Sequence, residues 1–182
     1  MWHGLRVIVM TKNIVVITGP ESCGKTTLAR QLAGHWEAPL VNEAARDYLQ
    51  RKDSYQESDL LEIAKLQSAM EQEKTVISAE KLVCDTDLLV ILIWSEVKYG
   101  RCDPWIRETL ENCFNKKSLT RHYILCDPKI PWQQDRLREN PYNRDELFAV
   151  YLKKLRDYKL AYSIVRGGPQ ERFQQALDCF KY

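Results

Sequence analysis

The sequence predicts an α/β fold, in which helices flank a parallel β-sheet. Short apolar segments rich in β-branched residues alternate with longer segments whose apolar residues recur at helical spacing. The first apolar segment leads through a glycine-bounded loop straight into a helix, which is a unit of parallel sheets. Polar residues or glycines follow each expected strand, and in a parallel sheet these strand ends share the edge where ligands bind.

Five strands are expected, at Ile14–Thr18, Leu40–Val41, Leu82–Cys84, His122–Cys126 and Tyr162–Val165. The expected helices are Gly24–His35, Ala44–Leu49, a long helix capped by Ser58 or Asp59, Leu88–Trp94, Asp145–Tyr162 and Glu171–Phe180. Residues 88–94 are apolar almost throughout, so periodicity alone does not separate a strand from a buried helix. We assign them to a helix because two parallel strands need a crossover between them.

Length and composition indicate one globular domain, which we expect at 13–182 after an N-terminal extension at 1–12. The net charge of +2 provides no basic field of the kind that binds nucleic acid or an anionic membrane. No apolar run approaches the roughly 20 residues of a membrane-spanning helix. The six cysteines include no C-x-x-C pair, so we expect reduced thiols and a cytoplasmic location rather than disulfides or zinc sites.

The loop after the first strand matches the pattern G-x-x-x-x-G-K-[ST], as Gly19-Pro20-Glu21-Ser22-Cys23-Gly24-Lys25-Thr26. The two glycines let backbone amides turn toward phosphate oxygens, and the new helix adds unpaired N–H groups and its positive dipole end. Lys25 reaches the β- and γ-phosphates. The sequence therefore predicts a P-loop NTPase that binds ATP, with the kinase-like strand order 2-3-1-4-5. The expected nucleotide contacts are residues 19–27, ending at Thr27, and Gly167, whose turn could wrap the base.

Mg²⁺ is expected beside this loop, held by Thr26 and Asp85. The Thr26 hydroxyl has the position of the magnesium ligand in P-loop proteins. Asp85 ends an apolar strand, where an acid of the Walker B type holds Mg²⁺ directly or through water. The alternative is that Asp85 caps the next helix, although Thr86 or Asp87 could also do so.

A kinase that acts on an alcohol needs a carboxylate within hydrogen-bond reach of the attacking hydroxyl. Glu43, at the end of the second strand, is our candidate for this base, with Asp85 and Asp87 as alternatives. Glu43 could equally be a surface residue at a helix start. Arg46 follows about one turn later, on the same side, where it would orient Glu43 or bind substrate. Asp87 could instead hold a substrate hydroxyl.

Two further groups of side chains are candidates for contact with the reactants. Arg136, Arg138 and Arg144 lie around a proline break and could close as a lid that neutralises the transferred phosphoryl group. Alternatively, they lie on an exposed helix and pair with acidic neighbours. Trp94 and Tyr99 could stack against a flat substrate ring, although aromatic side chains at helical spacing more often belong to the core.

With these motifs the chain resembles the ribosylnicotinamide kinase-type P-loop ATPases, the kinase half of bifunctional NadR proteins. The resembling stretches are ITGPESCGKTTLARQLA, VNEAARDYL, CDTDLLVILIWSEVKYG, CDPKIPWQQDRLRENP and IVRGGPQERFQQAL. The first is generic to P-loop proteins, whereas the third and fourth are more particular to this family. The matching positions are the P-loop, Asp85, Asp87, Trp94 and the lid segment 135–138. NadR proteins also carry an adenylyltransferase domain, for which we expect no room in this chain.

The resemblance implies ATP-dependent phosphorylation of nicotinamide riboside to nicotinamide mononucleotide, a step of NAD salvage. The alternatives are the same reaction on another nucleoside or metabolite, and a regulatory P-loop ATPase without a small acceptor. A GTPase is disfavoured because Asn115-Lys116-Lys117-Ser118 lacks the aspartate of the guanine-binding motif N-K-x-D. Adenylyl transfer is disfavoured because the sequence contains no histidine pair resembling H-x-G-H.

Overall fold

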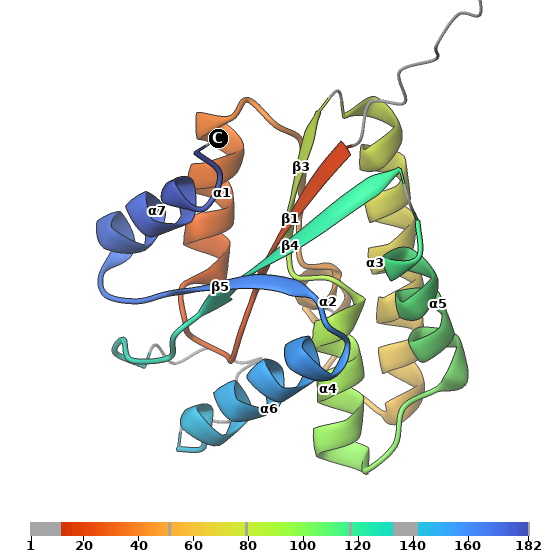
Figure 1. Cartoon of the computed structure of the whole chain (residues 1–182). Helices are drawn as coiled ribbons and strands as arrows, with labels where there is room; N and C mark the ends of the chain where they lie inside the picture. The colour runs from red at the N-terminus through yellow and green to blue at the C-terminus, as the bar shows by residue number, and fades with distance from the viewer. Residues whose placement is uncertain (1–11, 51, 79, 117, 133–141, 182) are drawn as a thin grey trace, which may run out of the picture.

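The computed structural model describes residues 12–50, 52–78, 80–116, 118–132 and 142–181. Its centre is a sheet formed by β1 (Lys12–Thr18), β2 (Leu40–Val41), β3 (Lys81–Asp85), β4 (Leu119–Cys126) and β5 (Ala161–Val165). Neighbouring strands run parallel, in the order β2-β3-β1-β4-β5 (Figure 1). The predicted fold class and strand order are confirmed.

The helices in this part of the chain are α1 (Lys25–His35), α2 (Ala44–Leu49), α3 (Glu57–Ile77), α4 (Leu88–Tyr99), α5 (Pro104–Phe114), α6 (Arg144–Asp157) and α7 (Pro169–Asp178). α4 confirms the assignment of residues 88–94 to a helix. We expected only a loop or helix edge at 99–105, whereas α5 begins there. Its start is defined by Asp103, whose carboxylate accepts a hydrogen bond from the backbone N–H of Trp105 at 2.8 Å.

The expected helix over Asp145–Tyr162 is wrong at its end. α6 stops at Asp157, because Lys159 has a φ of 53°, in the left-handed region that ends helices. The backbone N–H of Leu160 then returns to the carbonyl of Leu155 at 2.9 Å. This reversal lets β5 begin at Ala161.

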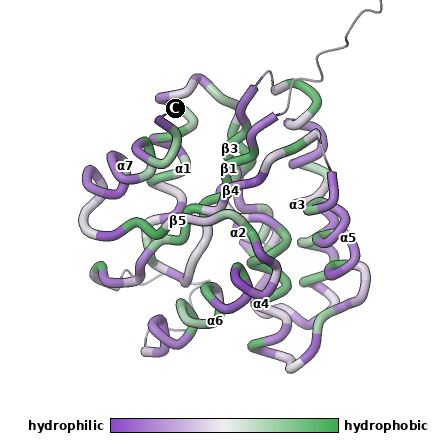
Figure 2. Tube along the Cα trace, in the orientation of Figure 1, coloured by the Kyte–Doolittle hydropathy of each residue, from purple (hydrophilic) through white to green (hydrophobic). Residues whose placement is uncertain are grey.

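The sheet is buried on both faces, as parallel sheets are. In β1, Ile14 and Val16 belong to the core covered by α2 to α6, whereas Val15 and Ile17 belong to the core covered by α1 and α7. All four side chains are at most 1% exposed. Apolar segments accordingly run along the strands in Figure 2. The two cores hold the sheet rigid, so its carboxyl edge can carry loops in fixed positions.

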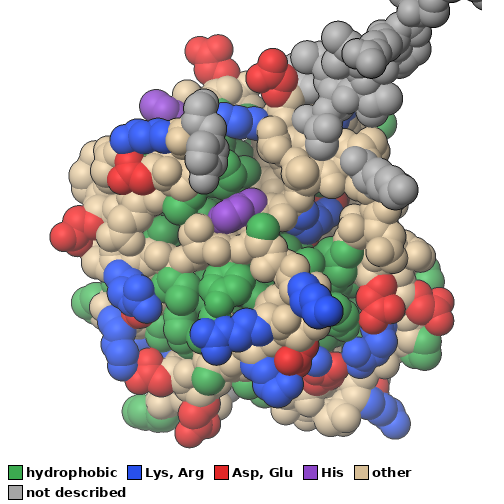
Figure 3. Space-filling model, in the orientation of Figure 1, with side chains coloured by type: hydrophobic (Ala, Val, Ile, Leu, Met, Phe, Trp, Pro, Cys, Tyr) green, Lys and Arg blue, Asp and Glu red, His purple; other side chains and the backbone are tan. Residues whose placement is uncertain are grey.

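The surface carries charges of both signs. On the face shown in Figure 3, Lys and Arg side chains are interspersed with Asp and Glu, and apolar side chains show between them. In the described residues no helix is both long and apolar enough to span a membrane. Of the predicted extension, residues 1–11 lie outside the described residues, and Lys12 already belongs to β1.

Candidate functional site

A cavity of about 540 Å³ opens at the carboxyl edge of the sheet, within the range of small-molecule sites. One part, the P-loop end, is lined by residues 19–27 with Ile130, Pro131, Gly167, Pro169 and Arg172. The other part, the α4 end, is lined by Glu43, Ala45, Arg46, Leu49, Val90, Ile93, Trp94, Val97, Lys98, Leu147 and Tyr151. The cavity therefore joins the phosphate-binding motif to a largely apolar chamber.

The P-loop backbone has the shape that its glycines predict. Gly19 has a φ of 135°, and a Cβ there would lie 2.8 Å from the carbonyl oxygen of Cys126. Gly24 has a φ of 81° and occupies the N-cap of α1 without a side-chain cap. The first turn of α1 contains Lys25 and no acidic residue, so the positive end of the helix is not neutralised by a carboxylate of its own turn. This arrangement suits an anion.

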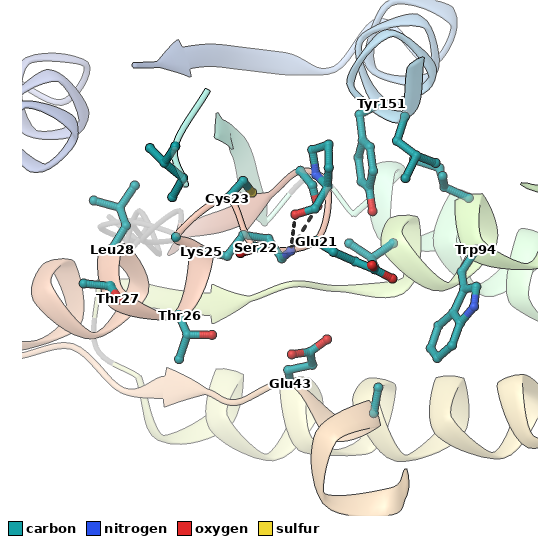
Figure 4. Close-up of a pocket in the computed structure, with 18 of the residues that line it drawn as sticks. Glu21, Ser22, Cys23, Lys25, Thr26, Thr27, Leu28, Glu43, Trp94 and Tyr151 are labelled. Atoms are coloured by element: carbon teal, nitrogen blue, oxygen red, sulfur yellow. Dashed lines mark hydrogen bonds between the residues drawn. The ribbon is translucent and has the colours of Figure 1, made fainter. Parts of the chain in front are cut away.

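Lys25 lies across the opening of the loop. Its Nζ donates hydrogen bonds to the carbonyl oxygens of Gly19, at 3.0 Å, and Pro20, at 2.8 Å (Figure 4). Burial lowers the pKa of the ammonium, but the negative groups around it, including Cys23 and Glu43, raise that pKa above its ordinary value. The side chain therefore stays charged at neutral pH, as phosphate binding requires.

The pKa of the Cys23 thiol indicates the sign of the electrostatic potential inside the P-loop. Burial raises its pKa, but a hydrogen bond with Cys126 and the positive charges of Lys25 and Arg172 lower it, to about 7 overall. A net lowering at a buried thiol means that the surroundings stabilise negative charge. The P-loop end therefore provides a positive potential as well as donors.

Asp85 and Thr26, the two residues that we expected to hold Mg²⁺, lie near each other. Asp85 is 2% exposed, and its Oδ1 has no hydrogen-bond partner among the described residues. Burial raises the pKa of this carboxyl, while Thr26 and the nearby cations lower it in part. A buried carboxylate oxygen without a donor, beside a hydroxyl, fits a hard cation such as Mg²⁺.

Glu43 faces the P-loop from the other side of the cavity (Figure 4). It occupies the N-cap position of α2 but makes no capping hydrogen bond. Its Oε2 lies 3.8 Å from Nε of Arg46, and both side chains line the cavity. Of the three carboxylates considered for the base, Glu43 is therefore the one that a substrate in the cavity would meet.

Trp94 lies at the α4 end, where its ring points into the cavity (Figure 4). Its Nε1 donates a hydrogen bond to the hydroxyl of Tyr55 at 2.9 Å, and the two rings meet edge to face with centroids 4.9 Å apart. Tyr55 thus fixes the orientation of the indole. Among the apolar side chains of this end, Trp94 offers the largest flat surface.

Asp87 and Tyr99, which we expected to contact the substrate, are not among the residues that line this cavity. Asp87 is 1% exposed, accepts the N–H of Leu89 at 3.0 Å as the cap of α4, and pairs with Arg121 at 3.0 Å. The hydroxyl of Tyr123 also donates to it, at 2.7 Å. Tyr99 is the last residue of α4 and packs against the core. In this structure Asp87 is held by contacts within the fold, and Tyr99 packs against the core, so their contact with a substrate stays a prediction.

The lid arginines Arg136 and Arg138 lie outside the described residues. Arg144, the first residue of α6, donates from Nη1 to the carbonyl of Ser22 at 3.3 Å and from Nη2 to the carbonyl of Ile130 at 3.0 Å. Its guanidinium also lies over the ring of Trp132, 5.6 Å from the centroid. Arg144 thus joins the P-loop to the segment that leads toward residues 133–141.

Sequence reasoning missed Arg172 and Tyr151. Arg172 is 3% exposed and donates to the backbone carbonyls of Gly167, Cys23 and Asp127 at 2.7, 2.5 and 2.7 Å. Tyr151, on α6, is 6% exposed and lines the cavity. Both lie in amphipathic helices, where a buried arginine or tyrosine leaves no pattern distinct from the core. The only sequence feature that pointed to Arg172 was its place in the stretch IVRGGPQERFQQAL, which resembles the NadR kinases.

Comparison with known proteins bears on the family and the fold of the chain. A family model described as an AAA domain matches residues 14–172. No curated protein matches the sequence. Among solved structures, a NadR protein in complex with NR has a TM-score of 0.69 at 22% identity, covering 93% of this chain and 48% of the NadR chain.

Two nucleoside or nucleotide kinases have the same fold. Thymidylate kinase from Ehrlichia chaffeensis matches with a TM-score of 0.64 at 10% identity, over 94% of this chain and all of that one. Deoxyadenosine kinase from M. mycoides matches with a TM-score of 0.58 at 13% identity, over 91% and 97% of the two chains. The chain thus has a P-loop kinase fold, and it spans about half the length of the NadR chain.

Proposed function

Because the chain belongs to the family described as an AAA domain, we propose that it is an ATP-dependent kinase that phosphorylates a hydroxyl group of a small molecule. The observation that carries this proposal is the position of Lys25 and Glu43 on opposite sides of one cavity (Figure 4). A cation for the γ-phosphate and a carboxylate for the attacking hydroxyl are the two groups that phosphoryl transfer to an alcohol requires.

In this proposal each group has one task. The amides of the P-loop and Lys25 hold the β- and γ-phosphates, and Glu43 accepts the proton of the acceptor hydroxyl. The bond between the γ-phosphorus and the bridging oxygen breaks as the acceptor oxygen bonds to that phosphorus, which leaves ADP and a phosphate monoester. Mg²⁺, when held by Thr26 and Asp85, neutralises charge on the phosphate oxygens.

Nicotinamide riboside is the acceptor that we propose first. The resemblance to the NadR kinases and the fold shared with a NadR protein in complex with NR support it. Trp94 offers a flat aromatic face beside apolar side chains, and a cationic ring over such a face gains on the order of 0.5–2 kcal/mol. The reaction would belong to NAD salvage, in the cytoplasm, where the free thiols of the six cysteines would persist.

Another nucleoside or metabolite is the second candidate acceptor. Arg46 and Lys98 both line the α4 end, and two cations favour an acceptor that carries a negative charge or several hydrogen-bond acceptors. Thymidylate kinase and deoxyadenosine kinase show that the fold accommodates such substrates. A regulatory ATPase remains the third candidate, which the same assay tests.

The test is an acceptor screen with Mg-ATP. Nicotinamide riboside, the common nucleosides and pantetheine-like alcohols are each incubated with the protein, and the phosphorylated product is identified by mass spectrometry. We expect Lys25→Ala to abolish product formation while the melting temperature stays near that of the wild type. Lys65→Ala, which removes an exposed lysine of α3, is the matched control and should remain active. Equal turnover by Lys25→Ala would refute the role of Lys25, and nucleotide binding without product from any alcohol would favour the regulatory ATPase.

A further inference from the structure

The hydroxyl of Tyr151 lies in the cavity and has no hydrogen-bond partner among the described residues. The side chain is 6% exposed, and its ring packs in the core beneath α6. No residue in the described ranges forms a hydrogen bond with its hydroxyl. In Figure 4 the ring descends from α6 and the hydroxyl oxygen points into the cavity, on the side of the P-loop. A buried phenol that points into a binding cavity, with no partner in the part of the chain that the structure describes, is suited to bind a ligand atom.

The charged groups around this hydroxyl define where it lies in the cavity. It interacts electrostatically with Lys25 and Cys23 of the P-loop, and with the carboxylates of Glu43 and Glu21. Burial raises the pKa of Tyr151; Lys25 opposes this effect, and the carboxylates add to it. The phenol therefore stays protonated at neutral pH, and it can donate a hydrogen bond between the two groups that the proposed reaction uses.

We propose that Tyr151 donates a hydrogen bond from its hydroxyl to an oxygen of the γ-phosphoryl group. Two candidate acceptors lie between Lys25 and Glu43, namely this phosphoryl group and the hydroxyl of the second substrate. A donor aimed at the attacking oxygen would reduce its nucleophilicity. A donor aimed at the phosphoryl oxygens stabilises the charge that they carry in the transition state. A hydrogen bond to the phosphoryl oxygens therefore supports the reaction, whereas one to the attacking oxygen opposes it.

This assignment rests on the proposed function and adds a consequence of its own. A contact to the γ-phosphate exists in the triphosphate complex and is lost in the diphosphate complex. Tyr151 then helps the site to distinguish ATP from ADP, independently of the acceptor. Nucleotide binding therefore tests the role of Tyr151 even while the acceptor is unknown.

The experiment compares Tyr151→Phe with the wild type in calorimetric titrations of two ligands, Mg²⁺ with β,γ-imido-ATP and Mg²⁺ with ADP. The substitution removes one oxygen and keeps the ring that packs in the core. We expect the imido-ATP to bind about tenfold more weakly, since a hydrogen bond to a charged group is lost, and ADP to bind unchanged. Tyr158→Phe is the matched control, because Tyr158 caps the C-terminus of α6 and its hydroxyl accepts from Arg107 at 3.4 Å. It should change neither affinity.

Four results would overturn the assignment. Equal losses for both ligands would indicate a structural effect, and unchanged affinity for both would mean that the hydroxyl contacts no phosphate. Intact nucleotide affinity with a raised KM for the acceptor alone would place the hydroxyl on the acceptor. If the wild type binds neither ligand, the proposed function fails and this inference fails with it. Binding of both ligands without turnover of any alcohol would refute only the kinase proposal.

Discussion

Glu43 and Asp85 are carboxylates at the ends of neighbouring strands that the fold places in different surroundings. Asp85 is buried beside Thr26 and is not among the residues that line the cavity, whereas Glu43 lies in the cavity wall. A proton acceptor must meet the substrate, and a metal ligand must be held rigidly beside the phosphates. The two surroundings therefore favour Glu43 as the base and Asp85 as the metal ligand, a choice that the sequence left open.

At the same scale, Glu43→Gln tests the base. Glutamine keeps the shape and the position beside Arg46 but cannot accept the proton. We expect kcat to fall about 10²- to 10⁴-fold, the contribution typical of general bases, while the affinity for Mg-ATP changes little. Steady-state kinetics and titration with ATP measure the two quantities. Glu108→Gln, at an exposed position of α5, is the control, and a kcat for Glu43→Gln near that of this control would exclude Glu43 as the base.

At the scale of one element, the N-terminus of α3 shows how a helix start depends on pH. Asp59 accepts the backbone N–H of Gln56 at 2.8 Å and the hydroxyl of Tyr48 at 2.8 Å, and it pairs with Lys52. The helix begins at Glu57 with Gln56 as its N-cap, so the expected cap at Ser58 or Asp59 was wrong by two or three residues. Asp59 acts instead as the third residue of a capping box.

Asp59→Asn should therefore destabilise the protein in a pH-dependent way. The bonds from Lys52, Gln56 and Tyr48 lower the pKa of Asp59 to about 2. Because this pKa is lowered, the ionised carboxylate stabilises the fold above about pH 4, and this stabilisation is lost as the pH falls toward 2. We expect the variant to be about 1 kcal/mol less stable at pH 7, with a difference that shrinks below pH 4. Urea unfolding across this range measures it, with Glu62→Gln as the control, and a difference independent of pH would contradict the capping role.

The elements also show what a sequence pattern can and cannot predict. The P-loop was predictable in detail, because its backbone demands glycine at fixed positions, as the 2.8 Å approach of a Gly19 Cβ to Cys126 illustrates. The buried helix α4 was predictable from topology, since two parallel strands need a crossover. The role of Asp87 as a helix cap was among the alternatives, but its ion pair with Arg121 was not, because Arg121 lies 34 positions later on another strand. A contact of that kind leaves no local signal in the sequence.

At the scale of the whole molecule, Arg172 links three segments that belong to different parts of the sequence. Its guanidinium holds the carbonyls of Cys23 in the P-loop, Asp127 after β4 and Gly167 before α7, and Cys23 lies 149 positions away. Each of its three nitrogens donates one bond to a backbone oxygen. Through Arg172, α7 holds the P-loop in place. Arg172 therefore lies in the cavity wall although it is not part of the nucleotide-binding motif.

Arg172→Met should show whether this junction stabilises the fold and shapes the P-loop. Methionine retains apolar bulk but leaves three carbonyls without their donor, those of Cys23 and Asp127 in buried positions, so we expect the free energy of unfolding to fall by about 2–4 kcal/mol. We also expect weaker binding of Mg-ATP, because the carbonyl of Cys23 in the P-loop loses its hydrogen-bond donor. Urea unfolding and calorimetry measure the two effects.

Arg166→Met is the matched control, since Arg166 is 62% exposed and pairs only with Asp127 among the carboxylates of the described residues, at 3.2 Å. Its loss should cost less than about 1 kcal/mol. If both variants lose the same small amount, the three bonds of Arg172 do not hold the loop.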